Sequence, residues 1–370
     1  MQSDFYAKEL AALKRSGRYR ERRIFNEEII DLASNDYLGL AHNSLLLEET
    51  LERLQTLESH ASKASMLVNG YTQVHQDFEQ GLCDANGFAA GVILGSGFNA
   101  NIAMIETLVR KGDALFMDEK YHASGVLASK LIDGELHYFS HNCTAELEIL
   151  LKKSTAKRNI VAVEGIYSMD GDLVPREIIE LADRYNALLI LDEAHSSGVI
   201  GANLMGILDH YDITVKPNHI KMGTLGKAYG SFGAYILASE HIVDFLINRA
   251  KPIIYATAPS LFDTLLGHKA LEYIQKNSDI LSAEIMLRQS IVKEILGVEV
   301  EGLIVPVEIA DNRKVMEIQK ILLEKKLLVG AIRQPTVPQA IIRFIARLGL
   351  RETEFRAACF SIKDAIDSVK

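Results

Sequence analysis

Lys227 stands in a glycine-rich stretch, residues 223–230, directly after the short predicted strand 220–222. Upstream, four aliphatic residues lead into Asp192. A buried strand that ends in an aspartate, followed by a glycine-flanked lysine, suits the chemistry of pyridoxal phosphate (PLP). The lysine amine can hold the cofactor aldehyde as a Schiff base, and the aspartate can keep a proton on the pyridine nitrogen, which makes the ring an electron sink. The pair therefore predicts PLP chemistry.

Two other interpretations of these residues are open at this point. Lys227 could contact a phosphate, although residues 223–230 lack the Walker A spacing. Asp192 and His195 lie three residues apart, but a zinc site needs further ligands, and the sequence offers no suitably spaced His or Cys pair. A carboxylate that follows an apolar strand is not expected to stand without a partner, and we favour the interpretation of Asp192 and Lys227 together as a PLP site.

A second motif, Gly-Ser-Gly-Phe-Asn-Ala at residues 95–100, joins a predicted strand to a predicted helix. The N–H groups and the dipole at a helix start bind anions, so the segment predicts a phosphate site. It also matches the dinucleotide pattern G-x-G-x-x-A, and Asp113 and Asp118 lie near the place of an acidic ribose partner. A nicotinamide oxidoreductase is therefore the rival enzyme class, although it gives Asp192 and Lys227 no task.

Further polar residues follow other predicted strands. His122 could stack on a flat cofactor or simply end a helix. Glu164 and Ser168 could belong to a site or to an ordinary turn cluster of Asp and Gly. Asp170 and Asp172 suggest a calcium loop, but the rest of an EF-hand pattern is missing. We therefore predict no metal site.

Three arginines, Arg333, Arg343 and Arg347, lie in the C-terminal part of the chain. The planar guanidinium fork suits a substrate carboxylate. Most arginines are solvated surface residues, so the residue type alone does not decide which of them binds substrate.

The elements that must position these side chains alternate between strand and helix patterns from about residue 90 to residue 250. Short runs of Val, Ile and Leu indicate strands covered on both faces, and the alternation implies right-handed crossovers and a largely parallel sheet. The expected strands are residues 90–94, 114–117, 136–139, 160–163, 188–191, 220–222 and 234–237. Ligands bind beyond the carboxyl ends of such strands, so Glu164, Asp192 and Lys227 could face one site.

The length of 370 residues predicts a large domain and a smaller one. We expect an N-terminal segment (1–44), a large PLP-binding domain (45–255) and a small C-terminal domain (256–370). The small domain should begin with a single long helix, 260–296. The elements expected after it are a strand at 298–307, a helix at 314–326, strands at 328–332 and 340–346, and a helix at 352–369. The fold class is α/β, with a mostly parallel sheet in the large domain and a smaller α/β C-terminal domain.

Composition excludes several classes of function. The net charge of −9 argues against nucleic acid or an anionic membrane as partner. No segment approaches the roughly 18 consecutive apolar residues of a membrane span, and residues 1–23 lack an apolar signal core. Three cysteines without a CxxC spacing predict neither a disulfide framework nor a zinc site. We expect a cytoplasmic protein without nucleic-acid or membrane partners.

Taken in order, these motifs resemble the α-oxoamine synthases, a family of fold type I PLP enzymes, over nearly the whole chain. The matching segments are residues 34–40, 70–71 with 74–76, 96–98, 122–124, 164 with 168–172, 192–195 with 198–201, 224–227 and 254–257. Any one of these motifs could arise by chance, whereas the ordered set is specific. The resemblance implies fold type I, PLP as cofactor and a homodimer with shared sites.

The resemblance also implies residue roles. Lys227 would carry PLP and later move protons, Asp192 would hold the pyridine nitrogen, and His122 would stack on the ring. Further cofactor contacts would come from Gly97, Phe98, Ser168, His195 and Thr224, and from Thr257 of the neighbouring subunit. Substrate contacts would come from Arg20, Asn35, His122, Thr336 and Arg343, with Arg343 on the amino acid carboxylate.

Residues 332–338 resemble most the branch of this family that condenses L-alanine with a pimeloyl thioester, with loss of CO2, in biotin biosynthesis. The acyl carrier would be CoA or an acyl carrier protein. Glycine C-acetyltransferase is the alternative within the family. A non-catalytic binding protein with the same fold is the third class, and the intact Lys227 and Asp192 argue against it.

Overall fold

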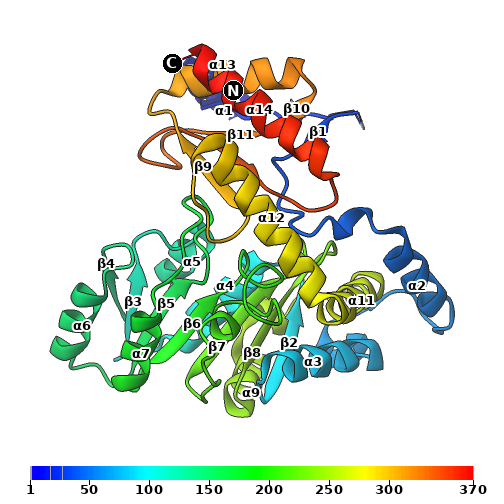
Figure 1. Ribbon diagram of the computed structural model, residues 1–370. Coiled ribbons are helices and arrows are strands. Elements are labelled where there is room, and N and C mark those ends of the chain that lie inside the picture. Colours follow the sequence, from blue (N-terminus) through cyan, green and yellow to red (C-terminus); the bar gives the residue numbers. More distant parts are fainter. Residues whose placement is uncertain (1, 17, 27, 370) are drawn as a thin grey trace.

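The fold is described from a computed structural model that covers residues 2–16, 18–26 and 28–369. The centre of the lower body in Figure 1 is a mixed sheet, which we call the large sheet. Its strands are β2 (Ala90–Leu94), β3 (Ala114–Asp118), β4 (Glu135–Phe139), β5 (Asn159–Glu164), β6 (Leu188–Asp192), β7 (His219–Thr224) and β8 (Ala234–Ala238). Their order across the sheet is β2-β8-β7-β6-β5-β3-β4.

The strand directions confirm the expected fold class. Strands β4, β3, β5, β6 and β7 are mutually parallel, while β8 runs antiparallel to both of its neighbours, β7 and β2. The seven strands expected between residues 90 and 237 are all present within the described residues, with small differences at their ends. Apolar runs identified the central strands because these are buried on both faces, whereas the edge strand β4 is partly exposed.

Helices cover the two faces of the large sheet (Figure 1). On β5, Val161 and Val163 join one buried apolar cluster, while Ile160 and Ala162 join another. Alternate side chains of a strand point to opposite faces, so the sheet lies between two cores. The helices of this body include α3 (Gln73–Asn86), α4 (Gly97–Leu108), α5 (Ala123–Ala128), α6 (Thr144–Lys153), α7 (Arg176–Arg184), α8 (Ile207–His210), α9 (Glu240–Arg249) and α10 (Lys251–Ile254). Single-turn helices lie at Leu40–His42, Met66–Gly70 and Ser129–Leu131.

A second, smaller unit lies above the large sheet in Figure 1. Its antiparallel sheet has the order β11 (Gly330–Ile332), β12 (Ile341–Ile345), β9 (Ile304–Glu308). Helices α13 (Asn312–Glu324) and α14 (Glu352–Val369) pack beside it. The N-terminal strand β1 (Ile30–Asp31) pairs in parallel with β10 (Leu327–Leu328), and α1 (Gln2–Arg15) lies at the same upper end (Figure 1).

The prediction of a single long helix at residues 260–296 is wrong. The segment forms two helices, α11 (Leu261–Lys276) and α12 (Ser278–Leu296), with a break at Asn277, whose backbone leaves the helical region. The Asn277 side chain donates to the carbonyl of Tyr273 at 2.8 Å, and such local bonding competes with helix continuation. The expected strand at 298–307 is also too long, since β9 begins only at Ile304.

These two helices connect the two parts of the molecule. Helix α11 packs against α2 (Ser44–Gln55) and α3, whereas α12 runs upward to α14 (Figure 1). The division of the chain after residues 44 and 255 remains a prediction. No helix in the described ranges combines the length and the apolar character needed to cross a membrane.

Candidate active site

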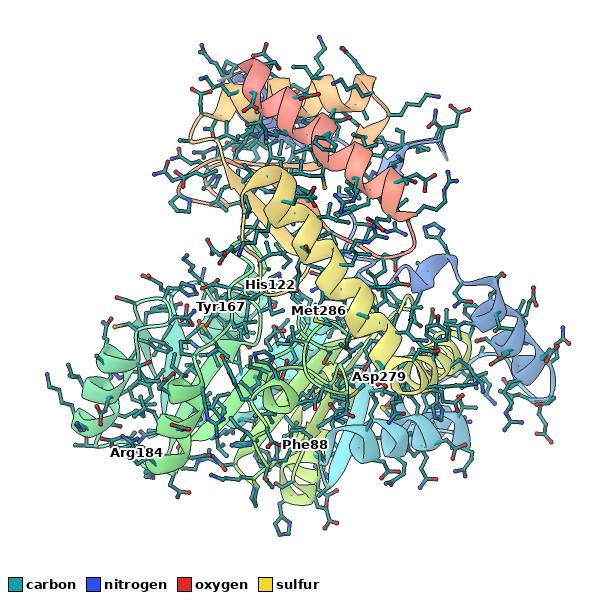
Figure 2. All side chains as sticks on the ribbon, in the orientation of Figure 1. Phe88, His122, Tyr167, Arg184, Asp279 and Met286 are labelled. Atoms are coloured by element: carbon teal, nitrogen blue, oxygen red, sulfur yellow. The ribbon has the colours of Figure 1, made fainter. Side chains whose placement is uncertain are left out.

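Three predicted site residues lie at one edge of the large sheet. Glu164, Asp192 and Thr224 are the last residues of β5, β6 and β7. Glu164 and Asp192 are register partners on adjacent parallel strands, and Lys227 follows Thr224 by three residues. The carboxyl ends of parallel strands are where α/β sheets bind ligands. Figure 2 shows His122 in the same region, between the large sheet and the upper unit.

The amine of Lys227 is the centre of this group. Its Nζ lies 2.9 Å from Nε2 of His195. Burial lowers the pKa of Lys227 to about 8, against the opposing charges of Asp192 and Glu164. A lysine with this pKa has a large neutral fraction near pH 8, and the neutral amine is the nucleophilic form. The position therefore suits covalent attachment to an aldehyde.

His195 is buried and joins Lys227 to the N-terminal part of the chain. The hydroxyl of Tyr37 lies 2.5 Å from its Nδ1. Burial first, and then the charges of Lys227 and Arg343, keep the pKa of His195 well below its usual value. The neutral ring can accept a hydrogen bond from the lysine amine at Nε2 and donate one from Nδ1 to the hydroxyl of Tyr37. The imidazole thus holds Lys227 in place without adding positive charge.

Arg343, on β12, brings the small sheet into the site. Its Nε donates to the carbonyl of Ser168 at 2.8 Å, and its Nη2 donates to Oδ1 of Asn35 at 3.1 Å. The side chain is 7% exposed. Two bonds to different segments hold the guanidinium in one orientation, as bidentate recognition of a carboxylate requires.

A second network surrounds Asp192. Its Oδ2 accepts from Nδ2 of Asn101 at 2.8 Å, and its Oδ1 accepts from the backbone N–H of Ala194 at 3.1 Å. The same Asn101 amide lies 2.9 Å from Oγ of Ser124, which lies 2.7 Å from Nδ1 of His122. Asp192 and His122 are therefore connected through two polar side chains.

Glu164 adds a second carboxyl group beside Asp192. Its Oε2 accepts from the backbone N–H of Ser168 at 3.2 Å, while its buried Oε1 has no hydrogen-bond partner among the described residues. Burial, and then the charge of Asp192, raise the pKa of Glu164 well above its usual value. This shift favours the protonated form of Glu164, which reduces the repulsion between two adjacent carboxyl groups.

The start of α4 forms the predicted anion site. Ser96 caps this helix and accepts from the N–H of Asn99 at 3.2 Å. The N–H groups of Gly97 and Phe98 then have no acceptor within the helix. A side chain at Gly97 would meet Cβ of Thr224 at 3.7 Å, so the structure places Thr224 beside the helix start. This arrangement suits a phosphate group.

Comparison with known proteins identifies the family. The family model for aminotransferase class I and II matches residues 27–362. The chain belongs to this family. The 8-amino-7-oxononanoate synthase of Helicobacter pylori (strain J99) is 42% identical over 340 residues, which cover 91% of each protein. The enzyme of that name from Dechloromonas aromatica is 34% identical, with 96% of each protein covered.

Solved structures agree on the fold of this aminotransferase-family chain. A serine palmitoyltransferase from S. paucimobilis, with a bound PLP–myriocin compound, has a TM-score of 0.88 at 21% identity and covers 100% of this chain and 98% of that one. An 8-amino-7-oxononanoate synthase from Francisella tularensis has a TM-score of 0.77 at 26% identity, with 93% and 99% covered. The expected fold type I architecture is confirmed, and the nicotinamide alternative is removed.

The residues of this family member fit the requirements of PLP. A buried carboxylate at Asp192 suits a protonated pyridine nitrogen, the helix start at Gly97 suits the phosphate, and the amine of Lys227 suits the aldehyde. The ring of His122 is exposed, so one of its faces is available for stacking. The unpartnered Oε1 of Glu164 adds a polar group that a bound molecule could satisfy.

Three other predicted residues lie outside this group. Arg20 is exposed in the coil after α1, Thr257 is exposed after α10, and Thr336 is exposed between β11 and β12. Among the described residues, no hydrogen bond or ion pair joins them to Lys227 or its neighbours. Their proposed contacts with acyl substrate or with a neighbouring subunit stay predictions.

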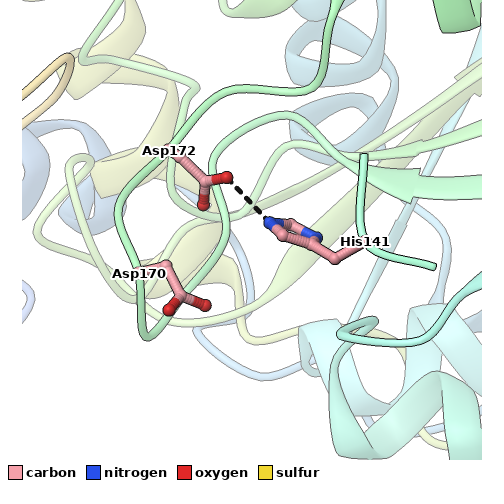
Figure 3. Close-up of side chains that lie close together, drawn as sticks. All are labelled: His141, Asp170 and Asp172. Carbon is pink, nitrogen blue, oxygen red and sulfur yellow. Dashed lines mark hydrogen bonds and ion pairs between the residues drawn. The ribbon is translucent and has the colours of Figure 1, made fainter. Parts of the chain in front are cut away.

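A polar cluster near the site involves the aspartates that suggested a calcium loop. In the described part of the chain, the ligand atoms of His141, Asp170 and Asp172 lie within 4.8 Å of one another (Figure 3). The ring nitrogens of His141 are bonded to Asp118 at 3.0 Å and to Asp172 at 2.7 Å, and Asp170 accepts from Lys120 at 3.0 Å. The aspartates of this cluster thus already pair with His141 and Lys120, while Oδ1 of Asp172 has no hydrogen-bond partner among the described residues.

Two residues with important contacts were missed by the sequence analysis. Tyr37 lies inside a matching segment but received no role, and its contact with His195 spans 158 residues of sequence. Asn101 was overlooked within a predicted helix. The sequence held one signal for it, because Asn101 is a polar residue on the helix face that also carries the apolar Met104, Ile105 and Leu108.

Proposed function

We propose that the protein is a PLP-dependent acyltransferase that condenses L-alanine with a pimeloyl thioester to give 8-amino-7-oxononanoate, a step of biotin biosynthesis. In this reaction Cα of alanine bonds to the acyl carbon, the thiol departs, and the alanine carboxylate is lost as CO2. The observation that carries the proposal is the 42% identity, over 91% of both chains, with a protein named 8-amino-7-oxononanoate synthase. The contact between Lys227 and His195, with the charge of Asp192 acting on the lysine amine, supports the proposal.

The residues act on the substrate and cofactor as follows. PLP, when bound, supplies an electron sink for the negative charge that develops at Cα. Lys227 carries the cofactor between turnovers and then moves the Cα proton, and its pKa of about 8 suits a base at neutral pH. Asp192 keeps the pyridine nitrogen protonated, and His122 stacks on the ring. Ser168 and His195 contact the cofactor ring on the side that carries its phenolic oxygen.

Different residues of the site hold the phosphate and the substrates in this proposal. The N–H groups of Gly97 and Phe98, with Thr224, hold the phosphate. Arg343 grips the alanine carboxylate, and its bond to Asn35 holds the guanidinium in place. Productive orientation of two substrates accounts for a large part of such a reaction's acceleration.

The acyl chain would be recognised by Thr336 and Arg20. Both side chains are exposed, so a substrate could reach them. The pimeloyl carboxylate at the far end of the chain would suit an arginine. The carrier is CoA or an acyl carrier protein. Glycine C-acetyltransferase is the competing activity.

The decisive experiment compares two substrate pairs on the purified, PLP-loaded protein. Pimeloyl-CoA with L-alanine should be turned over faster than acetyl-CoA with glycine, judged by kcat/KM. Faster turnover of acetyl-CoA with glycine would replace the proposed reaction with glycine C-acetylation. A protein without the visible absorbance of bound PLP would overturn the cofactor assignment as well.

The active unit is proposed to be a cytoplasmic homodimer in which Thr257 contacts the phosphate of the neighbouring site. Supporting this, Val68 is 77% exposed and Tyr255 is 80% exposed. The two segments are joined by the bond from Ser65 Oγ to the carbonyl of Ile254 at 2.9 Å. Large exposed apolar side chains that gather beside a site mark a surface for a protein partner.

Mixing of two variants tests the shared site. Lys227→Ala removes the attachment point, and Thr257→Ala weakens phosphate binding. If Thr257 acts in the neighbouring site, a hybrid dimer of the two variants has one site free of both changes, so mixing should restore activity and cofactor affinity. If Thr257 acts within its own subunit, or the active protein sediments as a monomer, mixing restores nothing and the proposal fails.

A further inference from the structure

The amide of Asn101 is bonded on every side. This side chain of α4 is 1% exposed. Its Nδ2 lies 2.8 Å from Oδ2 of Asp192 and 2.9 Å from Oγ of Ser124, and its Oδ1 lies 2.8 Å from the hydroxyl of Tyr121. An amide has two N–H donors and one carbonyl acceptor, so each is used. Buried polar groups that are satisfied in this way define a unique arrangement of their neighbours.

The direction of each bond follows from its chemistry. An ionised Asp192 can only accept, so the NH2 group of Asn101 must face it. The opposite orientation would place Oδ1 of Asn101 against a carboxylate oxygen with no proton between them. The hydroxyl of Tyr121 donates to Oδ1 and so stabilises the first orientation. One N–H of Asn101 therefore donates to Asp192, and the other donates to Ser124.

The same reasoning gives the direction of the hydrogen bond between Ser124 and His122. Because Oγ of Ser124 accepts from Asn101, its O–H is free to donate to Nδ1 of His122, 2.7 Å away. The backbone N–H of Ser124 donates to the same nitrogen at 3.3 Å. Two donors facing Nδ1 require that Nδ1 carries no proton. The proton of the neutral imidazole then lies on Nε2.

We propose that Asn101 is a positioning residue that holds the Asp192 carboxylate in its orientation and, through Ser124, keeps His122 as the neutral Nε2–H tautomer. The two residues it connects are those proposed to hold the pyridine nitrogen and to stack on the ring. This inference rests on the proposed function, from which it takes the roles of Asp192 and His122.

Two further observations support this assignment. Protonation of Nδ1 would set a new donor against the backbone N–H of Ser124, which cannot turn away. Burial also lowers the pKa of His122, and the charge of Lys227 adds to this effect while Asp192 opposes it. Geometry and electrostatics thus both keep the ring neutral. A ring fixed in tautomer and orientation can form one defined contact surface for the cofactor.

Nitrogen NMR of isotope-labelled histidine tests the tautomer directly in the PLP-loaded protein. The His122 signal is identified by its loss in the His122→Gln variant. We expect a protonated Nε2 and an unprotonated Nδ1. A ring with its proton on Nδ1, or with both nitrogens protonated near neutral pH, would overturn the inference whatever the enzyme's activity.

Variants test the link to the cofactor. Asn101→Leu keeps the branched shape of the side chain but leaves the buried Asp192 carboxylate without its side-chain donor, so the dissociation constant of PLP should rise about 10- to 100-fold and the absorbance of the bound cofactor should change. Tyr121→Phe keeps Asn101 but frees its amide to turn. We expect the dissociation constant of PLP to rise in this variant too, but only about 2- to 10-fold. This milder variant decides the matter if Asn101→Leu fails to fold.

Thr107→Val is the matched control, because Thr107 lies on the same helix and is also 1% exposed. It should change stability but neither cofactor affinity nor spectrum. If Asn101→Leu and Tyr121→Phe behave as this control does, Asn101 has only a structural role and the inference fails. If the wild-type protein binds no PLP, the proposed function fails instead, so the two failures can be told apart.

Discussion

Lys227 Nζ and His195 Nε2 lie 2.9 Å apart, which joins the strand end after β7 to the loop after β6. The other side of the His195 ring contacts Tyr37, from the N-terminal segment. A lysine held by a neutral, enclosed imidazole keeps a defined position while its pKa falls to about 8. This combination of a fixed position and a partly neutral amine is what an attachment lysine needs.

The first prediction concerns the identity of this lysine. Lys227→Ala should still bind PLP, since the phosphate and pyridine contacts remain, but borohydride should no longer reduce a linkage between protein and cofactor. Turnover should fall by several orders of magnitude, because both the attachment point and the proposed base are lost. Mass spectrometry after borohydride treatment measures the linkage.

A second buried lysine provides the control. Lys221 on β7 is 2% exposed, and its amine is bonded to Asn86 at 2.7 Å and to the carbonyl of Met205. Lys221→Met should lower the stability of the protein, but borohydride should still reduce a linkage between this variant and PLP. A label that persists in Lys227→Ala and disappears in Lys221→Met would move the assignment to Lys221.

The second prediction is the pH dependence of cofactor attachment to the cofactor-free protein. The neutral amine is the reactive form, and burial lowers the pKa of Lys227 from 10.5 to about 8. The attachment rate should therefore rise as pH increases through about 8 and level off above it. Stopped-flow absorbance at several pH values measures this rate. An attachment rate that continues to rise toward pH 10.5 would mean that the pKa of the Lys227 amine is not lowered.

The sequence predicted the parts of the fold and site that depend on local patterns. Strands β5 and β6 were predictable because they are nearly continuous apolar runs, and Glu164 and Asp192 could be placed because they end such runs. Strand β7 was harder to recognise because it contains Lys221, and Thr224 could be named only by resemblance. The break at Asn277 lies in a polar stretch, residues 275–279, which interrupts the apolar pattern. The prediction of one continuous helix missed this local signal.

The unpredicted parts of the site depend on contacts between distant segments. Asn101 meets Asp192 across 91 residues of sequence, and Tyr37 meets His195 across 158. No local pattern encodes such pairs. Arg343 could be named only by resemblance, and the geometry then placed it against Ser168 and Asn35 from two other segments.

The third prediction concerns Asp192. Asp192→Asn removes the negative partner of the pyridine nitrogen, so exchange of the alanine Cα proton with solvent should slow by about 100-fold or more, or about 3 kcal/mol. Proton NMR in deuterated water follows this exchange. Glu193→Gln is the control, because Glu193 is also buried but bonds Ser196 and the N–H of Ile207 instead. Exchange at the wild-type rate in Asp192→Asn would contradict the role.

The fourth prediction concerns Arg343. Arg343→Lys keeps the charge but cannot bind both carboxylate oxygens in a fork, so the KM for alanine should rise about 10- to 100-fold. The dissociation constant of PLP should change far less. Arg347→Lys is the control, because Arg347 is equally buried but pairs with Asp36 at 3.1 Å. Equal effects of Arg343→Lys on alanine and on PLP would mean that Arg343 supports the site only structurally.

The last prediction is a pH-dependent contribution to stability from His141. Burial opposes protonation of this ring, but its hydrogen bonds to Asp118 and Asp172 outweigh burial and raise its pKa to about 9. A histidine whose pKa is raised in the folded state stabilises the fold fully below its unfolded pKa of about 6.5 and loses this effect as pH rises through about 9. The shift corresponds to at most about 3 kcal/mol.

Chemical denaturation of the PLP-saturated protein at pH values on both sides of this window measures the effect. The difference in unfolding free energy between wild type and His141→Gln should be largest below about pH 6.5 and should shrink by pH 9 and above. His137→Gln is the control, because His137 also lies near a carboxylate, 3.3 Å from Glu135, but is 40% exposed. An exposed pair contributes little to stability at any pH.

Because Asp172 belongs to the loop that carries Ser168, loss of the His141 contact should also loosen this loop in the same pH range. A difference between wild type and His141→Gln that does not change with pH would show that the ring is not held in its charged form.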